Sequence, residues 1–155
     1  MISRSGIHAV RAVSSLARLG EGEFAGAAAL GRAIGAPGNY LGKLLQGLGR
    51  AGIVESRRGA GGGFRLAPRT RELTLLEVLE AVEDTRRWTG CFLGRTVCSD
   101  RDPCAMHDRW DRVRAAYRRF LSETTVADLA EREVRFAGAG PSAASRRPRF
   151  RRTTP

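Results

Sequence analysis

A run of glycines near the middle of the chain restricts the fold more than any other sequence feature. Gly59 and the glycines at 61–63 lie between two segments that are typical of short strands, residues 53–54 and 64–66. Because glycine adopts backbone conformations that other residues avoid, this run is suited to a tight turn. We therefore predict a β-hairpin with a glycine-rich tip. The pattern excludes a P-loop, since no Gly-Lys-Ser/Thr follows and no helix begins there.

Amphipathic segments precede this hairpin. Apolar residues at helical spacing predict helices over about residues 4–19, 26–33 and 37–52. The third helix carries a stripe of leucines that we expect to be buried, Leu41, Leu44, Leu45 and Leu48. Three helices followed by a hairpin form a winged helix, which is a helix-turn-helix variant with a β-ribbon appended.

The sequence after the hairpin predicts further helices around a loop. Residues 74–77 read Thr-Leu-Leu-Glu, a capping box that predicts the start of a helix. A loop over about residues 85–104 follows, and a short helix capped by Thr124 or Thr125 comes later. Between them, apolar side chains recur at spacings of 4, 3, 4 and 3, which predicts a pairing helix of about 17 residues. They are Met106, Trp110, Val113, Tyr117 and Phe120.

These patterns predict a mainly α fold with a small β-hairpin. We expect a winged-helix DNA-binding domain over 1–70, a cysteine loop with a dimerisation helix over 71–133, and a disordered basic tail over 134–155. There is no apolar run of about 18 residues that could span a membrane, and no apolar stretch typical of a secretory signal. We therefore predict a cytoplasmic protein without a membrane contact.

The charge of the chain indicates a nucleic-acid partner. The net charge is +11, and a single lysine accompanies the many arginines. Side chains that pair with base edges and phosphates lie opposite the leucine stripe: Asn39, Tyr40, Lys43, Gln46 and Arg50. Arginines of the hairpin are placed to contact the DNA backbone or the minor groove: Arg57, Arg58 and Arg65. We expect these residues to bind double-stranded DNA.

The cysteines form the second chemical pattern. Cys91, Cys98 and Cys104 are followed by His107, in the arrangement C-x6-C-x5-C-x2-H. An odd, clustered cysteine count argues against a disulfide framework and for a metal or redox centre. Three thiolates and an imidazole can anchor an iron–sulfur cluster or complete a tetrahedral zinc site, and the spacing alone does not separate the two.

Together these motifs resemble the iron–sulfur transcription regulators of the IscR and NsrR type. The resemblance covers about residues 1–133, and its most specific parts are the hairpin R-G-A-G-G-G-F-R-L, the helix N-Y-L-G-K-L-L-Q-G-L and the three-cysteine loop. It implies a homodimer with crossing long helices that binds a palindromic operator. It also implies a 2Fe–2S or 4Fe–4S cluster that senses nitric oxide, redox state or cluster supply.

The resemblance carries three ligands onto the cysteines and leaves the fourth open. Cys104-Ala-Met-His107 is similar to the IscR pattern, in which the histidine is the fourth ligand. NsrR-type proteins take an aspartate from the first helix of the partner subunit, where this chain has Ile7, which cannot ligate. We predict His107, with the adjacent His8 as the alternative. The first cysteine gap is one residue longer than usual in the family, and Gly42 replaces a polar residue of the recognition helix.

The leading interpretation is a cluster-controlled repressor. An electron-transfer or cluster-carrier protein is the alternative from another class, but it would not need a basic winged helix. A winged-helix regulator with structural zinc alone is the third. We see no catalytic dyad or triad, and we predict no enzymatic activity.

Overall fold

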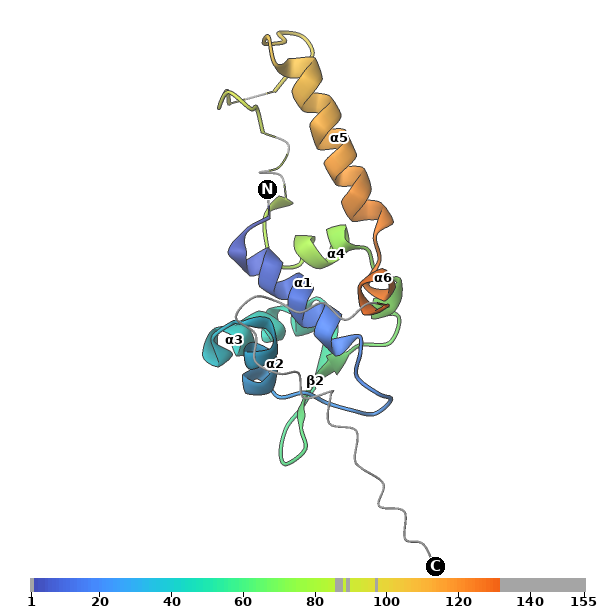
Figure 1. Cartoon of the computed structure of the whole chain (residues 1–155). Helices are drawn as coiled ribbons and strands as arrows, with labels where there is room; N and C mark the ends of the chain where they lie inside the picture. Colours follow the sequence, from blue (N-terminus) through green and yellow to red (C-terminus); the bar gives the residue numbers. More distant parts are fainter. Residues whose placement is uncertain (1, 86–87, 89, 97, 132–155) are drawn as a thin grey trace, which may run out of the picture.

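The computed structural model describes residues 2–85, 88, 90–96 and 98–131, and the structural statements below concern these residues. The predicted mainly helical fold with a hairpin is confirmed (Figure 1). In chain order the elements are α1 (Arg4–Leu16), α2 (Ala27–Ile34), α3 (Gly38–Arg50), β1 (Val54–Arg57), β2 (Gly63–Leu66), the 3-10 helix η1 (Thr70–Glu72), α4 (Leu75–Glu80), α5 (His107–Glu123) and α6 (Val126–Ala130). The predicted tail over 134–155 lies outside the described residues.

The first three helices pack around a closed apolar core. The leucine stripe of α3 points into it: Leu41, Leu45 and Leu48 are fully buried, and Leu44 is partly buried. Gly35 ends α2 with a left-handed backbone, so the chain turns directly into α3. α3 begins one residue later than predicted, because Pro37 is its N-cap and lies outside the helix.

The hairpin is attached to the helices by backbone hydrogen bonds. β1 pairs antiparallel with β2, and it begins and ends later than the predicted strand at 53–54. The backbone N–H and C=O of Phe64 also bond those of Ala25, both at 2.9 Å. Gly63 makes this approach possible, since a Cβ there would lie 2.5 Å from the carbonyl oxygen of Ala25. The hairpin is therefore joined to the loop before α2.

Two short helices after the hairpin begin at the same place. Thr74 caps α4 and Thr125 caps α6, each in a complete capping box with the acidic residue three positions later. The two starts are joined by backbone hydrogen bonds, from Leu75 N–H to the Thr124 carbonyl (2.8 Å) and from Val126 N–H to the Leu73 carbonyl (2.9 Å). The capping box predicted at Thr74 is confirmed.

The second half of the chain shares the core of the first. Val78 of α4 and Val126 of α6 are fully buried in the same apolar cluster as Val13 of α1 and Leu45 of α3. The predicted domain boundary at residue 70 stays a prediction. Leu75 and Leu79 of α4 also lie in a second apolar cluster, together with Trp88 and Leu121. Both α4 and α6 pack against α1 and so close the winged helix on that side.

α5 leaves this body as an arm. Figure 1 shows it extending away from α1 and α4, with the cysteine loop at its far end and the hairpin at the opposite end of the molecule. Its 17 residues match the predicted length. Only His107 and Leu121 of this helix are buried. Among the described residues, no helix is long and apolar enough to cross a membrane.

Candidate DNA-reading face and cysteine loop

The predicted reading residues of α3 divide into two groups. Asn39, Lys43, Gln46 and Arg50 are exposed on the face away from the leucine stripe. An open groove of about 810 Å³ lies between this face and the hairpin, and Gln46 and Arg50 line it. These side chains are accessible to a partner, as a DNA-reading face requires.

Tyr40 has a different environment. Its hydroxyl lies 2.8 Å from Ser5 Oγ, and its ring packs edge-on against His8, both on α1. The prediction grouped Tyr40 with the reading residues because the helical spacing placed it opposite the leucine stripe. Its position at the edge of the leucine stripe instead turns it toward α1, so in this structure it joins α1 to α3.

The arginines of the hairpin also differ from one another in their exposure and in their hydrogen-bond partners. Arg58 is exposed and has no hydrogen-bond or ion-pair partner among the described residues. Arg57 is exposed as well, but its Nη2 donates to the Gly61 carbonyl across the turn (2.9 Å). Arg65 is half-buried and bonds Glu55 through both Nε and Nη2, at 2.8 and 2.7 Å. Arg57 and Arg58 are thus more available to a partner than Arg65.

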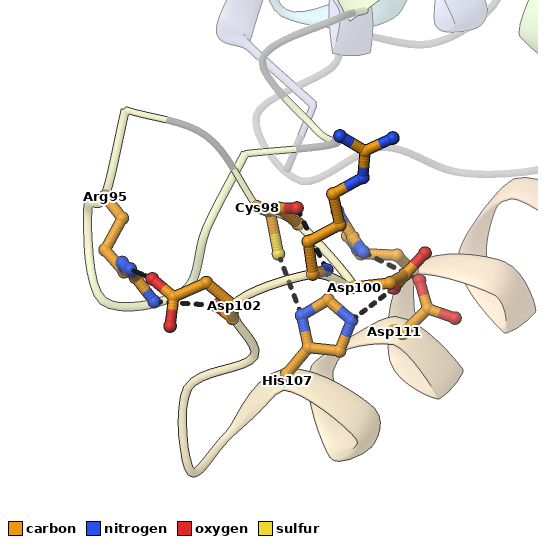
Figure 2. A network of polar contacts seen from close by, with 9 residues as sticks. Arg95, Cys98, Asp100, Asp102, His107 and Asp111 are labelled. Carbon is orange, nitrogen blue, oxygen red and sulfur yellow. Dashed lines mark hydrogen bonds and ion pairs between the residues drawn. The ribbon is translucent and has the colours of Figure 1, made fainter.

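The cysteine loop meets the start of α5 at His107. His107 is 7% exposed, and its Nδ1 lies 3.5 Å from the Sγ of Cys98. On the other side, Nε2 lies 2.7 Å from Oδ1 of Asp100 (Figure 2). Sequence reasoning missed Asp100, although an acidic residue near a candidate histidine ligand is the usual signal for an orienting partner. The structure therefore brings two predicted ligands, Cys98 and His107, into direct contact.

The other two cysteines lie in the same loop. Hydrogen bonds from the backbone N–H groups of Arg95 and Leu93 lower the pKa of the Cys91 thiol, and the thiols of Cys104 and Cys98 lower it further. Arg95 is paired with Asp102, and this carboxylate raises its pKa (Figure 2). All three thiols are free and partly exposed. As the side chains are placed, no three potential ligands of the described residues form a closed metal-binding group.

His8, the alternative fourth ligand, lies elsewhere in the chain's own fold. It packs against Tyr40, and its Nδ1 is buried with no hydrogen-bond partner among the described residues. Burial lowers its pKa, and Arg11 and Arg4 lower it further. Within one chain, therefore, His107 and not His8 accompanies the cysteines.

The predicted seam of α5 divides along its length. Trp110 packs on Phe92 of the cysteine loop and donates its indole N–H to the Gly90 carbonyl (2.8 Å). Tyr117 packs edge-on against the buried Trp88. Val113 and Phe120, in contrast, are each 55% exposed. The spacing correctly placed these residues near one face, but about half of that face is covered by the chain itself.

A short path of contacts joins the loop to the first helix. Glu83, just before the loop, accepts hydrogen bonds from the backbone N–H of Ser3 at 3.1 and 3.3 Å. Gly6 permits this approach, since a Cβ there would collide with the Glu83 carboxylate. Trp88, in the first part of the loop, lies in one cluster with Ile2, Leu79 and Leu121. Through α1, these contacts continue to Tyr40 on α3.

The fold, the basic face and the cysteine loop can now be compared with known proteins. A model of the Rrf2 family, described as an iron-dependent transcriptional regulator, matches residues 2–132. The chain belongs to the Rrf2 family of transcriptional regulators. The predicted relationship to IscR and NsrR is confirmed at this level.

Curated Rrf2-type relatives carry regulator names. The chain is 34% identical to the HTH-type transcriptional regulator IscR of Cereibacter sphaeroides over 105 residues, 66% of this chain and 68% of that one. It is 34% identical over 92 residues to the regulator NsrR of Shouchella clausii, 59% of this chain and 62% of that one. A putative HTH-type regulator of Aquifex aeolicus is 30% identical over 95 residues, and the match covers 60% of this chain and 66% of that one.

Solved structures match a longer part of this chain than these relatives do. The global cysteine regulator CymR of B. subtilis superposes with a TM-score of 0.69 and 26% identity, over 84% of this chain and 96% of that one. IscR of T. potens superposes with a TM-score of 0.66 at 24% identity, over 84% and 86% of the two chains, which shows the shared fold. The described residues thus have the architecture of an Rrf2 winged-helix regulator.

Proposed function

We propose that this Rrf2 protein is a dimeric DNA-binding repressor whose DNA affinity is set by an iron–sulfur cluster. The observation that carries the proposal is the contact between Cys98 Sγ and His107 Nδ1 at the start of α5. Cys91, Cys98, Cys104 and His107 are the proposed ligands.

The chemistry of these donors fits the cluster. Iron–sulfur clusters are held by thiolates, with histidine in some classes. The thiol of Cys91 has a lowered pKa, which favours the thiolate that binds metal. Asp100 is positioned to fix the ring of His107, as outer carboxylates do for histidine ligands. When bound, the cluster would supply reactivity toward nitric oxide or oxidants, because the loop is partly open to solvent.

The DNA contacts follow from the exposed side chains. We assign base reading to Asn39, Lys43 and Gln46 on α3, with Arg50 at its end. Arg57 and Arg58 are assigned to phosphates or the minor groove, and Arg65 to the support of the hairpin through Glu55. Tyr40 is assigned to the α1–α3 contact.

The second copy of the chain would pack on α5. Val113 and Phe120 present apolar area that is costly to leave in water, which supports a dimer through this side of the helix. The operator would then be a palindrome with half-sites about one helical turn apart, or a multiple of that.

Signal transfer uses the contacts of the chain itself. Trp110 holds the loop to α5 through the Gly90 carbonyl, and Glu83 holds the start of α1. A loop that changes its position would therefore move α1, and α1 contacts the reading helix through Ser5 and Tyr40. This route links the cysteines at one end of the molecule to the DNA face at the other.

The cluster is tested by purification without oxygen. We expect visible absorption from the native protein, its loss in Cys98→Ala, an altered spectrum in His107→Ala and an unchanged spectrum in His8→Ala. Ser99→Ala is the matched control within the loop. A colourless native protein containing zinc, or one without metal, would refute the cluster, as would a full spectrum in Cys98→Ala.

The reading face is tested with DNA selected by the protein from a random pool. Gln46→Ala should cost about 1–3 kcal/mol on the selected duplex if it makes a bidentate base contact, with little effect on scrambled DNA. Removing residues 141–155, which lie outside the described part, should weaken binding to both duplexes and lower the salt dependence. If the deletion abolished discrimination while Gln46→Ala and Lys43→Ala kept it, the reading element would lie elsewhere.

A further inference from the structure

Phe24 is an aromatic residue to which neither the sequence motifs nor the proposed function gives a role. It lies in the loop between α1 and α2, and its side chain is half-buried. Two arginines of the hairpin approach its ring: the guanidinium carbon of Arg57 lies 4.2 Å from the ring centroid, and that of Arg65 lies 4.9 Å away. At these distances both cations interact favourably with the ring face.

The two arginines differ in how many of their N–H donors remain available to a partner. Arg65 uses Nε and Nη2 on Glu55, and this ion pair already holds its guanidinium. Arg57 has a single hydrogen bond among the described residues, from Nη2 to the Gly61 carbonyl. Because a guanidinium carries five N–H donors around its plane, a ring against its face leaves the remaining donors of Arg57 available. Arg57 also lines the groove between α3 and the hairpin.

The ring is held in place by the backbone. Ala25, the next residue, makes two hydrogen bonds with Phe64 of β2, so the loop and the hairpin are joined immediately beside Phe24. Gly63 allows the close approach of the two segments. Phe24 is therefore fixed relative to the strand pair that carries Arg57.

We propose that Phe24 is a positioning residue for DNA binding, whose ring holds the Arg57 guanidinium ready to contact a DNA phosphate. In the native protein the ring already restricts the rotamers of Arg57. Without the ring, Arg57 would lose this freedom only on binding DNA, and that loss of entropy would lower the affinity. This inference rests on the proposed DNA-binding function and adds to it a residue that does not itself touch DNA.

The test compares side chains that keep or remove the aromatic face. The probes are the duplex selected from a random pool and its scrambled version, with the full chain. We expect Phe24→Leu to weaken binding to both duplexes about threefold to tenfold, because a phosphate contact carries no base preference. Phe24→Tyr keeps the ring face and should bind within about twofold of the native protein. If Phe24→Leu lowers the melting temperature, Phe24→Met replaces it in the same comparison.

A double-mutant cycle separates positioning from a general structural role. In an Arg57→Ala background, Phe24→Leu should cause no further loss of affinity. In an Arg58→Ala background it should cause its full loss, since Arg58 is the neighbouring exposed arginine without a contact to the ring. Arg57→Ala alone should lower the salt slope of binding by about 0.9, the value for one phosphate contact.

Several results would overturn the inference while leaving the DNA-binding function intact. Native binding by Phe24→Leu is one, a Phe24→Tyr defect as large as that of Phe24→Leu is another, and equal losses in the two arginine backgrounds is the third. If the native protein itself selected and bound no duplex, the proposed function would fail first and this inference with it.

Discussion

The winged-helix body and the α5 arm are built in opposite ways. In the body, α1, α2 and α3 direct their apolar side chains into one core, where Leu41, Leu45 and Leu48 have no exposed surface. In the arm, Val113 and Phe120 are 55% exposed, and the cysteine loop at the start of α5 exposes Phe92 and Leu93 as well. Apart from Ile7 of α1, which is 42% exposed, the large apolar side chains of the body are covered within one chain, whereas Val113 and Phe120 of the arm are not.

This difference indicates which parts depend on a partner. A closed core stabilises the reading face by itself, so α3 stays folded and can move as a rigid unit when α1 shifts. The arm has two incomplete features, an apolar side without a cover and a loop of free thiols. In the proposed function a second copy and a cluster complete them, which makes the arm the part that responds to conditions.

The largest effect expected from this comparison concerns the body. Leu45→Ala should lower the free energy of unfolding by about 2–5 kcal/mol, because it removes a fully buried side chain and leaves a cavity. Phe120→Ala, in the arm, should cost much less at protein concentrations where the chain is monomeric. Urea unfolding of both variants measures this. Equal costs under those conditions would mean that the arm is completed within one chain.

The next effect concerns the open side of α5. Val113→Asp should weaken self-association by about tenfold to a hundredfold, since a carboxylate would have to be buried in the proposed interface. Ala115→Asp, two positions away and also exposed, adds the same single charge and is the matched control. Sedimentation at a series of concentrations gives the dissociation constants. An unchanged dimer in Val113→Asp would move the interface off this side.

A smaller effect should appear where the loop is attached to the arm. Trp110→Phe keeps an aromatic ring against Phe92 but removes the N–H that bonds the Gly90 carbonyl. The expected loss is about 0.5–1.5 kcal/mol of local stability, with the body unaffected. Hydrogen exchange should be faster in the loop and unchanged in α3. Faster exchange throughout α3 would show that body and arm do not open separately.

The smallest effect is expected at the paired helix starts. Hydrogen bonds from the Thr74 backbone and hydroxyl lower the pKa of Glu77 below its ordinary 4.5, and Thr125 lowers that of Asp128 below 3.8 in the same way. Since the folded pKa values are depressed, this stabilisation is present above the ordinary values and is lost as the pH falls through the folded ones.

Glu77→Gln tests that contribution. The variant should lose part of the decline in unfolding midpoint that the native protein has between pH 5 and pH 3, while Glu80→Gln, on the exposed side of α4, should keep the native decline. Both variants are compared by urea unfolding across this range. Identical pH profiles of native protein and Glu77→Gln would mean that the cap does not contribute.

Local patterns in the sequence determined much of this protein. The leucine spacing of α3 identified its buried face, Thr74 and Glu77 identified a helix start, and the glycine run identified the hairpin. The length of α5 and the gathering of thiols and His107 near its start were also predicted. These features depend on neighbours within a few residues, where helix periodicity, capping and backbone freedom are decided.

Only the tertiary structure decided which side chains were already used by the fold. Tyr40 bonds Ser5, Arg65 bonds Glu55, and Tyr117 packs on Trp88, although the patterns presented all three as surface or interface residues. The partners come from distant segments, and a helical period places a residue on a face without saying what covers that face. The arginines against the ring of Phe24 and the pairing of α4 with α6 arise in the same way, from contacts that no local pattern encodes.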